Sequence, residues 1–224
     1  MQVKLGWKFI FAFFALNGVV SELHEQAHIT TGRVITGCYG PRDFNVWESC
    51  AANADVLPWA APLAGPLFSY LVMWLGVWLL RAAGTRSLGL ALVFAPLPFA
   101  RILTAAMGGG DEKIFLLRLT QDALAPGAAR WGALLITLLL AGPPIVLAWR
   151  ALRNRWRTAY VAGFCVLPLL VIWAYKLRFL NGLLQQGVLA EPVVAGTPLF
   201  VLLVLGLMLV ATALTWPWLR RAEG

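Results

Sequence analysis

The chain has 224 residues, of which 60% are hydrophobic and only 12% are charged, and its mean hydropathy is +0.77. These values lie outside the usual composition of a soluble globular domain and indicate a membrane protein. The formal net charge of +8 does not indicate nucleic-acid binding. The basic residues lie in short loops beside apolar runs, where membrane topology and lipid headgroups explain them.

Six apolar runs are long enough to cross a hydrocarbon core about 30 Å thick as helices. We therefore predict an all-α, polytopic membrane bundle with about six transmembrane helices, folded as a single integral membrane domain over residues 1–224. A motif-bearing core falls within residues 1–115, and residues 131–219 supply additional helices. The predicted helices cover residues 5–31, 57–81, 88–107, 131–150, 158–180 and 197–219.

The first predicted helix holds both histidines of the chain, His24 and His28, with Glu25 directly after the first. A helix places residues four apart on one face, so both imidazoles can reach one metal ion. Glu25 lies about 100° further round the helix, where it can act as a general base on a water molecule that the metal activates. Asn17 and Ser21 extend a polar stripe along the same face, which indicates a wet cavity or a helix interface.

A catalytic zinc site usually has three protein ligands and one open position. Because the chain has no third histidine, the remaining ligand should be a carboxylate or a cysteine. The strongest candidate is Asp111, with Glu112 beside it, after three glycines that permit unusual backbone geometry. The alternative is an ordinary loop with solvated charges. Each membrane crossing reverses the chain direction, so these carboxylates and the histidines should emerge towards the same face.

A family resemblance follows from three elements: the H-E-x-x-H motif, an A-G-P-L element at residues 64–67, and the glycine-adjacent Asp111. Together they resemble the site-2 protease family of intramembrane zinc metalloproteases, over about the first 115 residues. The resemblance implies one zinc ion bound by His24, His28 and Asp111, with Glu25 as the catalytic base.

Two features depart from the family pattern. The family's aspartate precedes a glycine, whereas here the glycines precede Asp111, so Glu112 remains an alternative ligand. Members often have an asparagine where this chain has Phe68 and Ser69.

Ser69 and Asn17 are further candidates for contacts with the substrate or the transition state. Arg101 is a third candidate, because it could stabilise a developing oxyanion. Its other possible roles are to pair with a carboxylate or to extend to the membrane interface.

We expect a zinc metalloprotease in a bacterial inner (plasma) membrane, which hydrolyses a peptide bond in a membrane-embedded or membrane-proximal polypeptide. Two alternatives are a non-enzymatic metal-ion carrier or binding module, and a zinc hydrolase that acts on lipid amides. The eleven tryptophans are typical of an interfacial belt.

Residues 111–130 mix charged and apolar residues, which favours an amphipathic helix on the membrane surface. Lys176, Arg178 and Asn181 are expected to anchor the fifth helix at the interface, with substrate contact as the alternative. Cys38 and Cys50 could pair in an oxidising compartment or remain free thiols.

The orientation in the membrane is open. With the N-terminus inside, ten basic residues face the cytoplasm and eight face the other side, so the histidine motif would lie towards the outside. The site-2 protease family, by contrast, places its metal site towards the cytoplasmic side.

Overall fold

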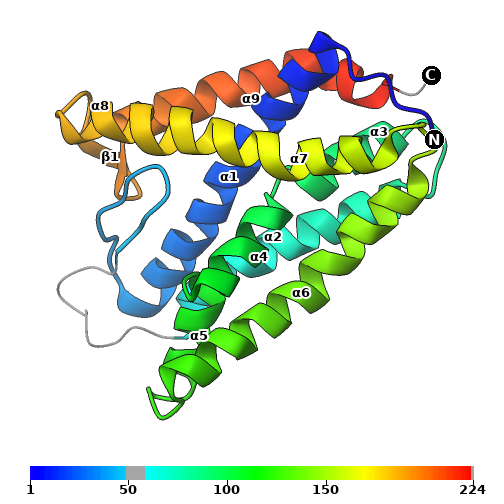
Figure 1. Ribbon diagram of the computed structural model, residues 1–224. Coiled ribbons are helices and arrows are strands. Elements are labelled where there is room, and N and C mark those ends of the chain that lie inside the picture. The colour runs from blue at the N-terminus through cyan, green and yellow to red at the C-terminus, as the bar shows by residue number, and fades with distance from the viewer. Residues whose placement is uncertain (49–58, 223–224) are drawn as a thin grey trace.

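The computed structural model describes residues 1–48 and 59–222 of the chain (Figure 1). The described residues form a bundle of helices with one small two-stranded hairpin, which confirms the predicted all-α, polytopic membrane class. The question of a Cys38–Cys50 pair involves Cys50, which lies outside the described residues.

The elements follow the chain in this order: α1 (Trp7–Thr36), α2 (Ala60–Leu79), α3 (Arg86–Phe94), α4 (Pro98–Met107), α5 (Asp111–Leu119), α6 (Pro126–Ala151), α7 (Arg157–Val171), the π-helix η2 (Ile172–Leu180), α8 (Asn181–Gln185), β1 (Pro192–Val194), β2 (Thr197–Pro198) and α9 (Leu199–Arg220). The two strands pair antiparallel.

Five helical segments of the described chain are long and apolar enough to cross a membrane: Ala60–Leu79, Arg86–Met107, Pro126–Ala151, Arg157–Gln185 and Leu199–Arg220. They correspond to five of the six predicted helices. The remaining one, α1, forms a 30-residue helix but carries charged residues along its length, which lower its mean hydropathy. It packs against α2 on one side and α9 on another, so its polar face is covered by protein.

The third predicted span is broken into α3 and α4. Prolines at positions 96 and 98 cannot donate backbone hydrogen bonds to a preceding turn, and the helix is interrupted there. Leu97 adopts a left-handed conformation with φ of 55°, and Pro98 begins the new helix at a position that proline favours. Ala95, Pro96 and Leu97 line a cavity beside the candidate site.

The fifth predicted span is longer than expected and irregular. It runs from α7 through η2 into α8, so it ends at Gln185 rather than near residue 180. Pro168 lies inside α7, and the π-helical turns follow within one turn of it. Such π-helical segments are often found at functional sites.

The stretch between the third and fourth predicted spans contains the helix α5, which is shorter than the amphipathic helix expected over residues 111–130 and packs against α2 and α6. Its position on the membrane surface stays a prediction. The helix begins at Asp111, ends at Leu119, and is followed by a turn that leads into α6 at Pro126.

The two termini lie at the same end of the bundle, close to the connection between α6 and α7 (Figure 1). Backbone contacts fix this arrangement, because Lys4 N donates to Ala222 O and Arg153 N donates to Met1 O. We call this the basic end, since it holds ten lysine and arginine residues: Lys4, Lys8, Arg81, Arg86, Arg150, Arg153, Arg155, Arg157, Arg220 and Arg221. The histidine motif lies towards the opposite end.

Candidate metal centre

Helix α1 directs its two histidines towards the same point, as the four-residue spacing requires. The Nε2 atoms of His24 and His28 are 3.1 Å apart, and their rings meet edge to face. His28 is buried at 1% exposure, and His24 is partly buried. Both side chains therefore point into the bundle rather than towards lipid.

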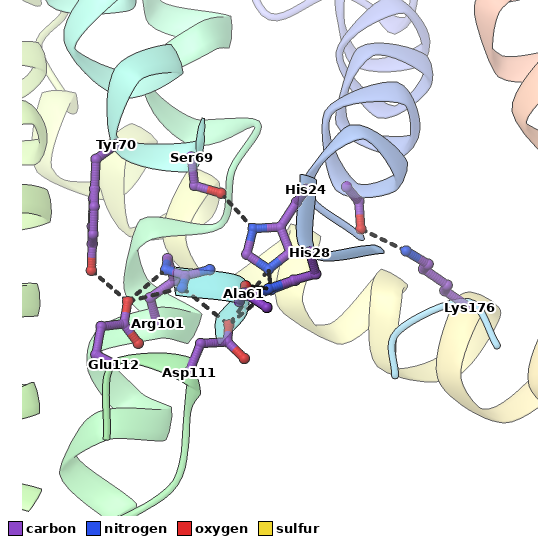
Figure 2. A network of polar contacts seen from close by, with 10 residues as sticks. His24, His28, Ala61, Ser69, Tyr70, Arg101, Asp111, Glu112 and Lys176 are labelled. Atoms are coloured by element: carbon purple, nitrogen blue, oxygen red, sulfur yellow. Dashed lines mark hydrogen bonds and ion pairs between the residues drawn. The ribbon is translucent and has the colours of Figure 1, made fainter. Parts of the chain in front are cut away.

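Asp111 reaches the histidines from the first turn of α5. Its Oδ2 atom lies 3.5 Å from His24 Nε2 and 3.6 Å from His28 Nε2. The glycines before it are required, because Gly108 and Gly110 adopt φ values of 89° and 93°, which other residues rarely adopt. Figure 2 shows the carboxylate turned towards both imidazoles.

The three atoms are spaced as ligands of one metal ion would be. Atoms bound to zinc in tetrahedral geometry at about 2.0–2.1 Å lie about 3.3 Å from one another, close to the observed separations of 3.1, 3.5 and 3.6 Å. A point about 2 Å from all three atoms exists between them. His24, His28 and Asp111 are the one such group of potential metal ligands among the described residues.

The second nitrogen of each imidazole is also engaged. His28 Nδ1 lies 2.7 Å from the carbonyl oxygen of Ala61, which can only accept a hydrogen bond. The proton of neutral His28 is therefore on Nδ1, which leaves the lone pair of Nε2 available for a metal. His24 Nδ1 lies 2.9 Å from Ser69 Oγ, which supports its ring in the same way.

Gly65 of α2 forms the wall of the site behind the imidazoles. A Cβ atom at this position would lie 2.2 Å from His28 Nε2 and 2.7 Å from His24 Cε1. The A-G-P-L element therefore has a direct structural role, because only glycine lets α2 approach the two histidines this closely.

Glu112, the alternative ligand, points away from the histidines. Tyr70 donates a hydrogen bond to its Oε1 over 2.5 Å, and Arg101 donates to the same oxygen through Nη2 over 2.8 Å. Glu112 is only 2% exposed, so these partners neutralise a buried carboxylate. Of the two adjacent acids, Asp111 is the one that faces the imidazoles (Figure 2).

Arg101 lies between the two carboxylates. Its Nη2 is 3.4 Å from Asp111 Oδ2 in addition to its pair with Glu112. Its side chain is only 11% exposed, so it does not extend to the membrane interface. Of the three roles considered from the sequence, the geometry matches carboxylate pairing.

The charge state of Asp111 suits a metal ligand. Its partial burial acts to raise the pKa of the carboxyl group, but hydrogen bonds with His24 and His28 and the charge of Arg101 outweigh burial. The net result is a pKa well below the ordinary value, so the group is a carboxylate at neutral pH.

Glu25 and Asn17 occupy different environments. Glu25 is 7% exposed, and within the described part of the chain its carboxylate has no hydrogen-bond or ion-pair partner. A carboxylate in this state is available to accept a proton.

Asn17 is fully buried and donates to the carbonyl oxygen of Ala95 over 2.6 Å. It therefore joins α1 to the break after α3 and does not line the cavity.

A cavity of about 270 Å³ opens beside the three candidate ligands. Its polar wall includes His24, Ser69, Arg101 and Asp111. The break between α3 and α4 and residues of η2 also line this cavity, so both irregular helical segments face the same space.

Lys176 was expected to anchor η2 at the membrane interface, and this expectation is wrong. Its ammonium group is buried, 2.9 Å from Glu22 Oε1 and 2.6 Å from Ser21 Oγ. Arg42 pairs with the other oxygen of Glu22 over 2.5 Å. Asn181 is also buried rather than interfacial. The buried carboxylate of Glu22 attracts the Lys176 ammonium group into the bundle, because a buried charge is stabilised by each charge that pairs with it.

The segment between α1 and residue 48 covers the histidines. Trp47 stacks on the ring of His28 with centroids 5.5 Å apart. Asn181 accepts a hydrogen bond from Phe44 N over 3.1 Å and donates to Asp43 and Asn45. Sequence analysis did not single out Trp47 or Tyr70, since neither belongs to a motif or to a helical repeat of polar residues.

No protein-family model, curated protein sequence or solved structure matches this chain. The resemblance to site-2 proteases thus depends on the motif residues alone.

The first prediction concerns the close contact at Gly65. Gly65→Ala should lower zinc affinity by at least about tenfold, because the added methyl group displaces the imidazoles and disturbs their supporting contacts. Zinc binding by the purified protein can be measured by metal-competition titration. Gly142→Ala in α6 is the matched control, since a Cβ there meets no atom within 4 Å. Equal zinc affinity in both variants would contradict the geometry described above.

A second prediction separates the two adjacent carboxylates. Asp111→Asn should weaken zinc binding by more than about a hundredfold because a ligand is lost, whereas Glu112→Gln should weaken it about tenfold through a supporting contact. The same titration tests both variants. The reverse order of the two losses would make Glu112 the ligand.

Proposed function

We propose that this protein is a membrane-embedded zinc metallopeptidase of the site-2 protease type. The observation that carries the proposal is the convergence of His24 Nε2, His28 Nε2 and Asp111 Oδ2 to mutual distances of 3.1–3.6 Å. Two imidazoles and one carboxylate form a ligand set found in catalytic zinc sites. The buried Glu25, next in sequence to a ligand, supplies the remaining group that such a hydrolase needs.

When bound, zinc would lower the pKa of a water molecule and polarise the scissile carbonyl group. Glu25 would accept the proton of the attacking water and transfer it to the leaving amine. Its isolation from other partners supports this role, because an ion-paired carboxylate would be a weaker base. Ser69 and the carbonyl of Ala61 would hold the two imidazoles in orientation through their Nδ1 atoms.

The network around Asp111 would keep this ligand in place. Arg101 contacts both Asp111 and Glu112, and Tyr70 fixes Glu112 from α2. This arrangement attaches the first turn of α5 to α2 and α4, so the ligand is positioned by three helices. Arg101 and Tyr70 are therefore positioning residues in this proposal.

The shape of the cavity bears on the substrate. A space of about 270 Å³ accommodates a short segment of chain and not a folded domain. A membrane-embedded polypeptide would have to unwind locally, because the hydrogen bonds and side chains of a helix shield its carbonyl carbons. The break at Leu97 and the π-helix η2 line the same cavity with irregular backbone. An extended segment of the substrate would lie against them.

A third prediction tests the general base. Glu25→Gln should retain zinc but lower the rate of peptide-bond hydrolysis by about a hundredfold or more, since general base catalysis contributes at least that factor. Purified protein in proteoliposomes would be incubated with a mixture of synthetic transmembrane peptides, and the products identified by mass spectrometry.

The exposed Glu191 provides the control, since Glu191→Gln removes a carboxylate outside the site and should leave the rate unchanged. An unaltered rate in Glu25→Gln would refute the assigned role. A parallel incubation with N-acylated lipids tests the substrate class, because cleavage of lipid amides alone would exclude a peptidase.

The distribution of charge supports an orientation in a bacterial inner membrane. Two of the eight basic residues outside the basic end, Arg101 in α4 and Lys176 in η2, lie inside helical segments in ion pairs and not in flanking loops. Loop arginines and lysines determine orientation, so the difference between the ends is larger than the sequence count suggests. We therefore place the basic end in the cytoplasm and the metal centre towards the opposite side, which departs from the site-2 protease family.

A fourth prediction follows for two exposed positions. In intact cells, a membrane-impermeant maleimide should label Ala125→Cys, at the start of α6, but should label Arg155→Cys, at the basic end, only after permeabilisation. Labelling of the unsubstituted protein gives the background from native cysteines. The opposite pattern would reverse the orientation and would leave the metal chemistry unaffected.

A further inference from the structure

The basic end differs in charge from the rest of the molecule. All eight acidic residues of the described chain lie in or towards the half that contains the histidines: Glu22, Glu25, Asp43, Glu48, Asp111, Glu112, Asp122 and Glu191. Positive charge is therefore concentrated at the other end of the described chain. A concentration of positive charge of this kind attracts anions.

Three of these arginines line one recess. Arg86 comes from the start of α3, Arg150 from the last turn of α6, and Arg153 from the segment that follows α6. The recess has a volume of about 650 Å³ and is also lined by Gln2 and Leu80. It is thus formed by elements that are distant in sequence, and not by one charged loop.

The walls of the recess are fixed by hydrogen bonds. Asn154 accepts a hydrogen bond from Val3 N over 3.0 Å and donates to Val3 O over 3.0 Å. Arg153 N donates to Met1 O over 2.8 Å. These contacts hold the segment after α6 against the N-terminal residues, so the arginines project from an ordered backbone.

Exposed tryptophans at this end support a position of the recess at the level of the lipid headgroups. Trp7, Trp78 and Trp156 are 69%, 63% and 65% exposed and lie at this end of α1, α2 and α7. Trp149, one residue before Arg150, stacks against Arg157. The guanidinium carbon of Arg157 lies 3.9 Å from the centroid of the Trp149 ring. Exposed tryptophans at helix ends are typical of the membrane interface.

We propose that this recess binds the phosphate of an anionic lipid headgroup. Guanidinium groups recognise phosphate through paired hydrogen bonds. Within the described chain, the side chains of Arg150 and Arg153 have no hydrogen-bond or ion-pair partner, so their donors are available. Like charges that share a recess repel one another, and a bound phosphate would offset this repulsion. The recess lies outside the metal centre, so the proposal stands independently of peptidase activity.

The test compares lipids on the full-length protein. Native mass spectrometry of the detergent-purified protein titrated with phosphatidylglycerol should show tighter binding than with phosphatidylcholine. Arg150→Gln combined with Arg153→Gln should weaken phosphatidylglycerol binding by about thirtyfold, the combined effect expected for two basic residues near an anionic surface. Inorganic phosphate is titrated in parallel, and it should bind more weakly than the lipid.

The control removes two charges from the same end but outside the recess, by Arg220→Gln combined with Arg221→Gln. This pair should retain nearly all of the affinity, and melting temperatures should show that both double variants remain folded. Equal losses in the two double variants would mean general electrostatic attraction and would overturn the proposal. So would equal affinity for the two lipids, or binding of inorganic phosphate in preference to the lipid.

Discussion

Three electron-pair donors that meet inside an apolar bundle impose the main physical constraint on this structure. The Nε2 atoms of His24 and His28 and the Oδ2 atom of Asp111 approach within 3.1–3.6 Å of one another. In a low-dielectric interior such groups are costly unless a cation or protons compensate them. A metal ion would satisfy all three at once, and Gly65 and the glycines before Asp111 are the backbone features that allow the approach.

The surrounding polar groups form two networks that isolate this centre. Arg101 and Tyr70 neutralise Glu112 on one side, while Arg42 and Lys176 neutralise Glu22 on the other. Glu25 in α1 lies outside both networks, whereas Asp111 in α5 faces the two imidazoles and also contacts Arg101 over 3.4 Å. Paired charges therefore provide structure, and Glu25 is the buried acid without a hydrogen-bond or ion-pair partner among the described residues. The same separation concentrates positive charge at the basic end.

Helical periodicity made part of the site predictable. Both histidines follow from a four-residue spacing, and the reversal of direction at each crossing brings Asp111 to the same side. The sequence favoured Asp111 but left Glu112 as an alternative, because the direction of each carboxylate depends on the left-handed backbone at Gly108 and Gly110. Lys176 was misassigned because its partner Glu22 is far away in sequence. The exact position of the helix break at Leu97 could not be predicted, because it depends on how Pro96 and Pro98 share the distortion of the backbone.

X-ray absorption at the zinc edge of the purified protein examines the central claim most directly. The account predicts a first shell of nitrogen and oxygen atoms at about 2.0–2.1 Å, with outer-shell scattering from two imidazole rings that decreases in His28→Ala. A spectrum without imidazole scattering, or one that does not change in His28→Ala, would contradict it.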